Sequence, residues 1–375
     1  MAILGSGGAE DFGETSSTRF DWTLLAVIIA LVCLGFVNIF SKTVGHFGDD
    51  NIVLRQFFNL LVALGVLGVV MLFDYRLFER VAYFGYGLNL LALMLVPTFG
   101  VIRYGARRWL DLGFMNWQPA ESMKLMTVLA LARYFQTRVS PRSMGLKELA
   151  IPGLLVGVPA ILTIAQPDLG TGGHLAITGF IILLFVGIRP KILLTFAFMG
   201  IVSFPIFWKY GLKPYQKDRI FTFLNPAENR QGEGYNAWQS LIAVGSGEVF
   251  GQGFRKGTQT QLDFTPEGHT DFIFTVLAEE WGFVGVICLF ILYLMLFYRC
   301  SQIAIQANDP FGAVLCVGVI GLLGSQIFIN ISMVSGMFPI VGIPLPLLSY
   351  GGTALISALV GLGLIMNVGF RRSIF

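Results

Sequence analysis

The sequence predicts an all-α polytopic integral membrane protein with ten transmembrane helices. Hydrophobic residues make up 55% of the 375 residues and charged residues only 13%, whereas soluble domains carry about twice that charged fraction. The apolar residues form runs of helix length, and about 20 of them in a row cross the hydrocarbon core of a bilayer. Backbone groups in lipid must bond internally, and these long runs favour helices over the short alternating strands of a β-barrel.

Ten runs meet this criterion, and each is expected to form one span. In chain order they cover residues 22–40, 55–73, 79–98, 118–136, 148–165, 172–189, 191–209, 271–298, 311–335 and 347–369. The fourth run is the least apolar, because Lys124 and Arg133 bracket its core. No small-residue cleavage site follows the first run, so it is expected to be a retained helix and not a signal peptide.

These runs predict a single membrane domain over residues 22–370, with short tails at 1–21 and 371–375. A large polar loop at about 210–270 separates the seventh and eighth helices, and short interfacial helices are expected in it around Trp238–Val244. No internal repeat is visible in the sequence, which disfavours a transporter built from two inverted halves.

The basic residues of the short loops predict the orientation, since cytoplasmic loops carry an excess of Lys and Arg. An even number of spans places both termini on one face, which is expected to be cytoplasmic, and the large loop is then extracytoplasmic. The basic residues on the cytoplasmic face are Arg19, Arg76, Arg80, Arg138, Arg142, Lys147, Arg189, Lys191, Arg299, Arg371 and Arg372.

Composition disfavours several other classes of function. The net charge is +3 and no basic run of five or more residues occurs, so nucleic acid is not expected as a partner. The four cysteines form no C-x-x-C pair, and no H-E-x-x-H sequence accompanies the three histidines. Neither a disulfide nor a protein-built zinc site is therefore expected, and no built-in cofactor is predicted.

Charged residues gather at the outer ends of the third and fourth spans, against the orientation rule. Arg107 and Arg108 offer paired guanidinium forks that suit phosphate or carboxylate, and anionic lipid headgroups are the alternative partner. The next helix is expected to start at Gln118, and Glu121 and Lys124 are neighbours on one of its faces. That pair either neutralises itself so that the span can insert, or offers a cation to a pyrophosphate.

Acidic residues occupy two helix starts on the same face. Asp168 is expected to cap the sixth helix, and its carboxylate also suits a divalent cation. Thr270 is expected to be the N-cap of the eighth helix and Asp271 its first or second residue, where the helix dipole stabilises a negative charge. Acids favour such positions for structural reasons alone, but an ionised carboxylate there also suits a general base. Glu279 and Glu280, roughly 12 Å deeper, are expected to be paired within the bundle.

Taken together and in order, several strings resemble the RodA/FtsW family of shape, elongation, division and sporulation (SEDS) proteins. They are RRWLDLGF with QPAE, QPDLGT, GYNAWQS with AVGSG and FGQGF, HTDFIF, and GIPLPLLSYGGT. The resemblance covers nearly the whole chain, and the wording GTQTQLDF is more similar to the elongation branch, RodA, than to the division branch, FtsW. It implies ten transmembrane helices in the bacterial cytoplasmic membrane. It also implies peptidoglycan glycosyltransferase activity, which polymerises lipid II, an undecaprenyl-pyrophosphate-linked precursor, into β-1,4 glycan on the outer face.

The resemblance further implies roles for individual residues. Asp271 matches the family's essential aspartate and would take the proton of the acceptor's 4-hydroxyl, or position that hydroxyl, in one inverting displacement. Arg108 and Lys124 would stabilise the departing pyrophosphate, with Glu121 orienting Lys124. Supporting roles fall to Gln118, Asp168, Gln239, Asp263 and His269. A divalent cation, Mg²⁺ or Mn²⁺, would be compatible with this chemistry, and its ligands are unknown.

The implied partners are lipid II and the nascent glycan strand, a class B penicillin-binding protein transpeptidase, and membrane proteins of the elongation complex. Two alternatives stay open, a flippase for the same precursor and a scaffold that positions the transpeptidase. A flippase would distribute polar residues through the depth of the membrane, whereas the candidate groups crowd its outer half, which favours an enzyme. A pure scaffold would tolerate loss of the Asp271 carboxylate.

Overall fold

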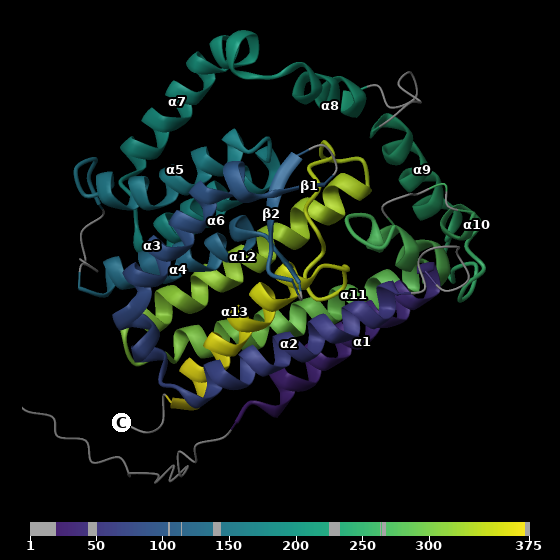
Figure 1. Cartoon of the computed structure of the whole chain (residues 1–375), viewed down its shortest axis with the longest axis horizontal. Coiled ribbons are helices and arrows are strands. Elements are labelled where there is room, and N and C mark those ends of the chain that lie inside the picture. Colours follow the sequence, from purple (N-terminus) through teal and green to yellow (C-terminus); the bar gives the residue numbers. More distant parts are fainter. Residues whose placement is uncertain are drawn as a thin grey trace, which may run out of the picture.

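The computed structural model describes residues 20–43, 51–103, 106–113, 115–137, 144–224, 233–262, 264 and 268–371. Each predicted span coincides with one helix (Figure 1). These helices are α1 (Trp22–Thr43), α2 (Ile52–Leu72), α3 (Tyr75–Phe99), α4 (Pro119–Gln136), α5 (Ala150–Ala165), α6 (Leu169–Val186), α7 (Pro190–Ile206), α11 (Ile273–Ile305), α12 (Pro310–Val334) and α13 (Gly352–Arg371). Within the described residues, seven helices are long and apolar enough to cross a membrane, and α5 and α7 are shorter apolar helices. The all-α membrane class is confirmed, and ten as the number of spans stays a prediction.

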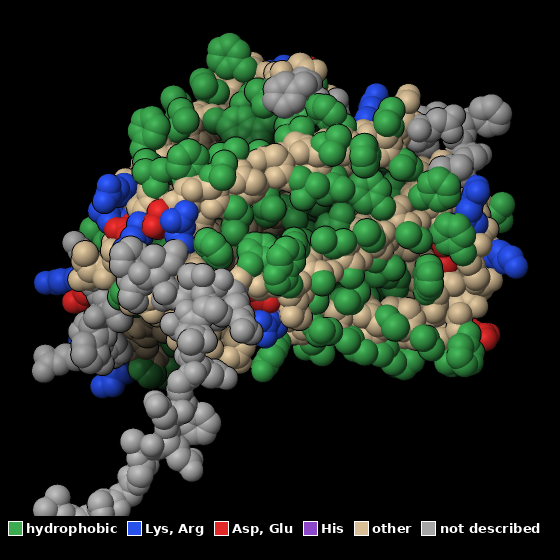
Figure 2. Space-filling model, turned by 90° about the horizontal axis from the view of Figure 1, so that it is seen from below, with side chains coloured by type: hydrophobic (Ala, Val, Ile, Leu, Met, Phe, Trp, Pro, Cys, Tyr) green, Lys and Arg blue, Asp and Glu red, His purple; other side chains and the backbone are tan. Residues whose placement is uncertain are grey.

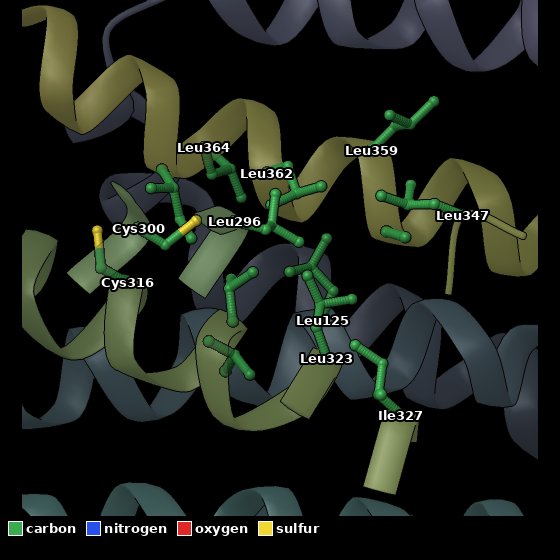
Figure 3. Close-up of a cluster of buried hydrophobic side chains, with 14 of the residues drawn as sticks. Leu125, Leu296, Cys300, Cys316, Leu323, Ile327, Leu347, Leu359, Leu362 and Leu364 are labelled. Carbon is green, nitrogen blue, oxygen red and sulfur yellow. The ribbon is translucent and has the colours of Figure 1, made fainter. Parts of the chain in front are cut away.

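The centre of the bundle is built by α12 and α13. In their most apolar windows 67% and 72% of the residues are buried, against 11% for α2. In Figure 3, buried side chains of α12 and α13 meet those of α4 and α11. They include Leu125 of α4, Leu296 of α11, Leu323 of α12 and Leu362 of α13. Because α4, α6 and α11 all pack on α12, this central helix fixes its neighbours relative to one another.

Hydrophobic side chains also cover the outside of the bundle. Figure 2 shows a face on which apolar side chains form a nearly continuous surface, while most charged side chains gather towards its two ends. Leu72 and Phe84 are 77% and 76% exposed. An apolar surface of this extent is unfavourable in water and favourable in lipid, so it agrees with the predicted spans.

The large loop contains α8 (Pro214–Leu224), α9 (Glu233–Ser246) and the single turn α10 (Thr258–Gln261). The helix expected around Trp238–Val244 is thereby confirmed as part of α9. Figure 1 places α7 and α8 along the periphery of the bundle, and none of the described side chains of α7 is buried. By contrast, α9 packs on α11 and α12, so this part of the loop is attached to the bundle.

A small antiparallel sheet in the loop between α3 and α4 is a feature that the sequence did not predict. It consists of β1 (Val101–Arg103), β2 (Ala106–Asp111) and β3 (Asn116–Trp117), in the order β1-β2-β3. Aromatic and β-branched residues favour paired strands, and here Val101 lies opposite Trp109. Arg108 lies on the middle strand of this sheet.

Two helices start later than predicted. Phe272, not Thr270, is the N-cap of α11, and Asp271 lies in the preceding turn. The carbonyls of residues 269–271 accept hydrogen bonds from other segments, and they therefore do not begin the helical ladder. The tenth span was predicted from residue 347, whereas α13 begins at Gly352. Leu347 has a φ of +67° and Gly351 a φ of +159°, both outside the helical region, and these two residues interrupt the predicted helix.

The helix α11 is broken at Gly282, whose φ of 64° and ψ of −162° lie outside the helical region. Backbone hydrogen bonds of 2.9 and 3.0 Å join both sides of the break to the loop at 248–253. The amides of residues 283–284 donate to this loop, and the carbonyls of residues 279–280 accept from it. The polar groups that the break frees are thus satisfied by the large loop, which ties that loop to the helix following Asp271.

The two acids before this break bind the large loop and the end of α1. Glu279 accepts hydrogen bonds from the amides of Gln259 (2.8 Å) and Thr260 (2.9 Å) in α10. Glu280 accepts one from the hydroxyl of Ser41, close to the last residue of α1. Both carboxylates are therefore paired, as predicted, but their partners come from the large loop and a helix end and not from the interior of the bundle.

Candidate functional site

Asp271 is partly buried in the turn that precedes α11. Its backbone carbonyl accepts a hydrogen bond of 2.8 Å from Nδ2 of Asn330 on α12. Its carboxylate lies against the connection between α12 and α13, because a Cβ on Gly342 would be 3.2 Å from Oδ2 of Asp271. Gly342 has a φ of +74°, a conformation that glycine adopts without strain. This glycine therefore lets the connection run directly beside the carboxylate.

A second group of predicted site residues meets at the turn between α5 and α6. Arg108 donates from Nη2 to the carbonyl of Pro167, and its Nη1 is 3.8 Å from Oδ2 of Asp168. The same carboxylate oxygen accepts a hydrogen bond of 3.3 Å from Nε2 of Gln118. The other oxygen caps α6 by accepting from the amide of Thr171 (3.1 Å), as predicted. The structure thus brings Arg108, Gln118 and Asp168 together although they lie on three separate segments.

Arg108 combines partial exposure with unused hydrogen-bonding capacity. Its side chain is 29% exposed, and its Nε is buried without a hydrogen-bond partner among the described residues. The guanidinium carries five N–H donors, and the contacts with Pro167 and Asp168 leave part of this fork available. An anion with several oxygens, such as a phosphate, is the chemical partner that suits such a fork.

Glu121 and Lys124 form a buried ion pair one turn into α4. Nζ of Lys124 is 2.8 Å from both carboxylate oxygens of Glu121, and the side chains of Lys124 and Glu121 are 2% and 6% exposed. The predicted i, i+3 pairing is confirmed, and the two charges compensate each other inside the bundle. In this arrangement the ammonium is enclosed by protein, so Arg108 is the more accessible cation.

The connection between α12 and α13 contacts both the Asp271 carboxylate and the start of α6. A Cβ on Gly170, two residues after Asp168, would be 2.5 Å from Val341. The next residue of the connection, Gly342, borders the Asp271 carboxylate. The connection therefore links the Asp271 turn to the helix start that Asp168 caps, and Asp168 is the carboxylate beside Arg108.

The remaining predicted residues occupy different positions. His269 lies two residues before Asp271. The centroid of its ring is 5.7 Å from that of the Tyr350 ring. Gln239 lies on α9, and its Oε1 is buried without a hydrogen-bond partner in the described part of the chain. Asp263 lies outside the described residues. For metals, no group of three or more His, Cys, Asp or Glu side chains with suitable proximity occurs within the described ranges.

Two polar residues that contact the Asp271 turn were not predicted from the sequence. Asn330 is fully buried, and Ser349 donates a hydrogen bond of 2.7 Å to the carbonyl of Thr270. Asn330 interrupts the apolar run at 311–335, and an amide within a membrane span is a signal for a specific role. Ser349 carries no comparable signal, because its neighbours in sequence do not reveal which turn it contacts.

Comparisons with known proteins show the family of this chain. The family described as cell cycle protein, which groups FtsW, RodA and SpoVE, matches residues 21–373. The chain is 38% identical over 355 residues to the peptidoglycan glycosyltransferase MrdB of Escherichia coli K12, covering 94% of both proteins. It is 33% identical to the stage V sporulation protein E of Bacillus subtilis, covering 94% of this chain and 98% of that protein.

Solved structures share the fold. The Rod shape determining protein RodA of Thermus thermophilus superposes with a TM-score of 0.71 at 31% identity, covering 94% of this chain and 98% of that one. A chain from a peptidoglycan synthase complex that coordinates polymerisation and crosslinking gives a TM-score of 0.81 at 33% identity, with the same coverage. The chain belongs to the FtsW, RodA and SpoVE family of cell cycle proteins.

Proposed function

We propose that this protein is a peptidoglycan glycosyltransferase that polymerises lipid II into β-1,4 glycan strands on the outer face of the cytoplasmic membrane during cell elongation. The observation that carries the proposal is that one connection borders the Asp271 carboxylate at Gly342 and, at Val341, the start of α6, whose capping residue Asp168 lies beside Arg108. A transfer from a pyrophosphate-linked sugar needs a base for the acceptor hydroxyl and a cation for the departing pyrophosphate. Peptidoglycan glycosyltransferases among the relatives, such as MrdB, support the same activity.

Asp271 is proposed as the general base of this transfer. The carboxylate would accept the proton of the 4-hydroxyl of the acceptor sugar as that oxygen forms a bond to the anomeric carbon of the donor. The bond between that carbon and the pyrophosphate oxygen breaks, and the pyrophosphate departs with its electron pair. Because pyrophosphate is already a good leaving group, no second carboxylic acid is needed to protonate it, in contrast to glycoside hydrolysis.

Arg108 is proposed to hold the pyrophosphate of the donor. The carboxylate of Asp168, itself held by the amide of Gln118, orients the guanidinium from one side, so that its remaining donors face the anion. Lys124 and Glu121 are proposed to assist through the charge and rigidity of their buried pair. Gln239, Asp263 and His269 are proposed to have supporting roles around the acceptor; the two that the structure describes belong to α9 and to the Asp271 turn.

Replacing Arg108 with alanine is expected to raise the KM for lipid II by about tenfold or more, because charge-assisted hydrogen bonds are worth about 1.5–3 kcal/mol. Arg108→Lys keeps the charge but loses the forked donors of the guanidinium. Its KM for lipid II should lie between those of the alanine variant and the wild type. The matched control is Arg107→Ala, since Arg107 lies on the same strand and donates to the carbonyl of Pro97 (3.1 Å). Unchanged donor kinetics in both Arg108 variants would remove this residue from the site.

A divalent cation, Mg²⁺ or Mn²⁺, is proposed to assist at the pyrophosphate. Asp168 is the carboxylate beside Arg108, and it already accepts hydrogen bonds from Gln118 and from the start of α6. Phosphate oxygens and water would therefore supply most of the ligands, as Mg²⁺ prefers in phosphate sites. When bound, the cation would withdraw charge from the leaving group.

The decisive experiment combines purified protein with lipid II, alone and with its cognate class B penicillin-binding transpeptidase, which we propose as its partner. Glycan chains in the presence of wild-type protein support the enzyme. Absence of polymer together with movement of lipid II across vesicle membranes would support a flippase instead. Absence of both activities, with enhanced crosslinking by the transpeptidase, would support a scaffold. We further propose that both termini face the cytoplasm, which accessibility labelling of single cysteines in cells would test.

A further inference from the structure

Three successive carbonyls of the Asp271 turn accept hydrogen bonds from outside the turn. The carbonyl of His269 accepts from the amide of Tyr350 (2.9 Å). The carbonyl of Thr270 accepts from the hydroxyl of Ser349 (2.7 Å), and that of Asp271 accepts from Nδ2 of Asn330 (2.8 Å). All the donors lie on α12 or on the connection that follows it. The turn is therefore anchored by its backbone to α12 and to the connection that follows it.

Asn330 is the central residue of this anchor. Its Nδ2 also donates to the carbonyl of Ile343 (2.7 Å), the residue after the glycine that borders the Asp271 carboxylate. One amide group thus bridges the backbone of the Asp271 turn and the backbone of the segment beside it. The side chain is 0% exposed, and its Oδ1 has no hydrogen-bond partner among the residues that the structure describes.

The two hydrogen bonds that Asn330 donates fix the orientation of its side-chain amide. A buried acceptor without a partner costs about 1–3 kcal/mol. Turning the amide over would place Oδ1 against the carbonyls of Asp271 and Ile343, where two acceptors repel a third, so the orientation of the amide is fixed. Both N–H groups of Asn330 therefore donate to the two backbone carbonyls, and its Oδ1 has no partner among the described residues.

We propose that Asn330, supported by Ser349, is a positioning residue that holds the Asp271 carboxylate at a set distance from the connection between α12 and α13. This inference rests on the proposed role of Asp271 as general base. A base must lie within hydrogen-bond reach of the hydroxyl that it deprotonates, and a displacement of about 1 Å can cost about 100-fold in rate. Loss of the bridge frees the turn to move relative to Gly342 and so weakens the alignment of the base.

The test compares two buried amides that each donate two hydrogen bonds to backbone carbonyls. Asn367 on α13 donates from Nδ2 to the carbonyls of Val70 and Phe73, both at 2.7 Å, at the opposite end of the bundle, and its Oδ1 also accepts from the amide of Tyr75 (3.2 Å). Asn330→Ala and Asn330→Asp are expected to lower kcat by about 10–100-fold with little change in the KM for lipid II. Asn367→Ala loses three hydrogen bonds, one more than Asn330→Ala, and is expected to lower the Tm while leaving kcat unchanged.

A second pair of variants keeps the test decisive if the Asn330 variants fail to fold. Ser349→Ala removes the hydrogen bond that Oγ donates to Thr270 and the one that it accepts from the amide of Leu345 (2.7 Å), and Ser349→Thr retains the hydroxyl for both. We expect Ser349→Ala to lower kcat by about tenfold and Ser349→Thr to restore most of it. Wild-type kcat in the Ser349→Ala variant, or an equal fall in kcat for Asn367→Ala and Asn330→Ala, would overturn the positioning role.

Parallel measurement of Asp271→Asn separates this inference from the proposed function. If that variant stays fully active, Asp271 is not the base and both proposals fail. If it is inactive while the folded Asn330 and Ser349 variants polymerise lipid II at the wild-type kcat, only the positioning role fails.

Discussion

Replacing Asp271 with asparagine is expected to lower the rate of lipid II polymerisation by about 10²–10⁴-fold, the usual contribution of a general base. Asparagine has nearly the same size as aspartate but has no basic oxygen. The backbone carbonyl of residue 271, which accepts from Asn330, is unaffected by the exchange. Stability should therefore change little, and the loss of rate can be assigned to the carboxylate. The measurement is the initial rate of glycan formation alongside the Tm in detergent.

Asp271→Glu gives a graded result at the same position. It keeps the carboxylate but adds a methylene, and the space for that group is limited on the side of Gly342. There a Cβ would already be only 3.2 Å from Oδ2 of Asp271. The polymerisation rate of this variant is expected to lie between that of Asp271→Asn and that of the wild type.

A matched control for both Asp271 variants is Asp111→Asn. Asp111 lies on β2, and its Oδ1 accepts from the amide of Gly113 (2.8 Å), so it caps a turn at the surface. This variant is expected to polymerise at the wild-type rate. Glycan chains in equal yield from Asp271→Asn and wild type would rule out the general base.

The sequence predicts the helices because a long apolar run can be recognised without knowing which other segments it contacts. The runs at 22–40 and 311–335 become α1 and α12 with ends shifted by no more than a few residues. The pair of Glu121 and Lys124 was also predictable, since a spacing of three places two side chains on one helix face. Its burial to a few per cent exposure was not, because that depends on how α6, α12 and α13 surround α4.

Contacts between distant segments set the parts that the sequence could not predict. The start of α11 shifts beyond Asp271 because donors from Asn330, Ser349 and Tyr350 occupy the carbonyls that would begin the helix. Similarly, the association of Arg108 with Asp168 depends on a strand pairing in one loop and a turn in another. The identity of the acid came from the resemblance, whereas the residues that hold it in place came from the structure.

Replacing Gly247 with alanine is expected to destabilise the folded protein by about 3 kcal/mol or more, at the upper end of overpacking effects. A Cβ at Gly247 would be 1.9 Å from the carbonyl oxygen of Ala278 on α11. The obstacle is backbone, which cannot rotate away as a flexible side chain would. Relief requires the loop at 248–253 to separate from the break at Gly282, with loss of the backbone hydrogen bonds that join them.

Gly245→Ala is the matched control, two residues earlier and within helix α9. A Cβ at Gly245 would have no atom within 4 Å outside its own helix. Alanine is favoured over glycine in a helix by up to about 1 kcal/mol, so this variant should be as stable as wild type or more so. The measurement is the Tm of each purified protein in the same detergent. Equal Tm values for Gly247→Ala and Gly245→Ala would show that the large loop is not locked to α11. A fall confined to Gly247→Ala, together with lower polymerisation by the folded fraction, would show that this contact supports the segment that follows Asp271.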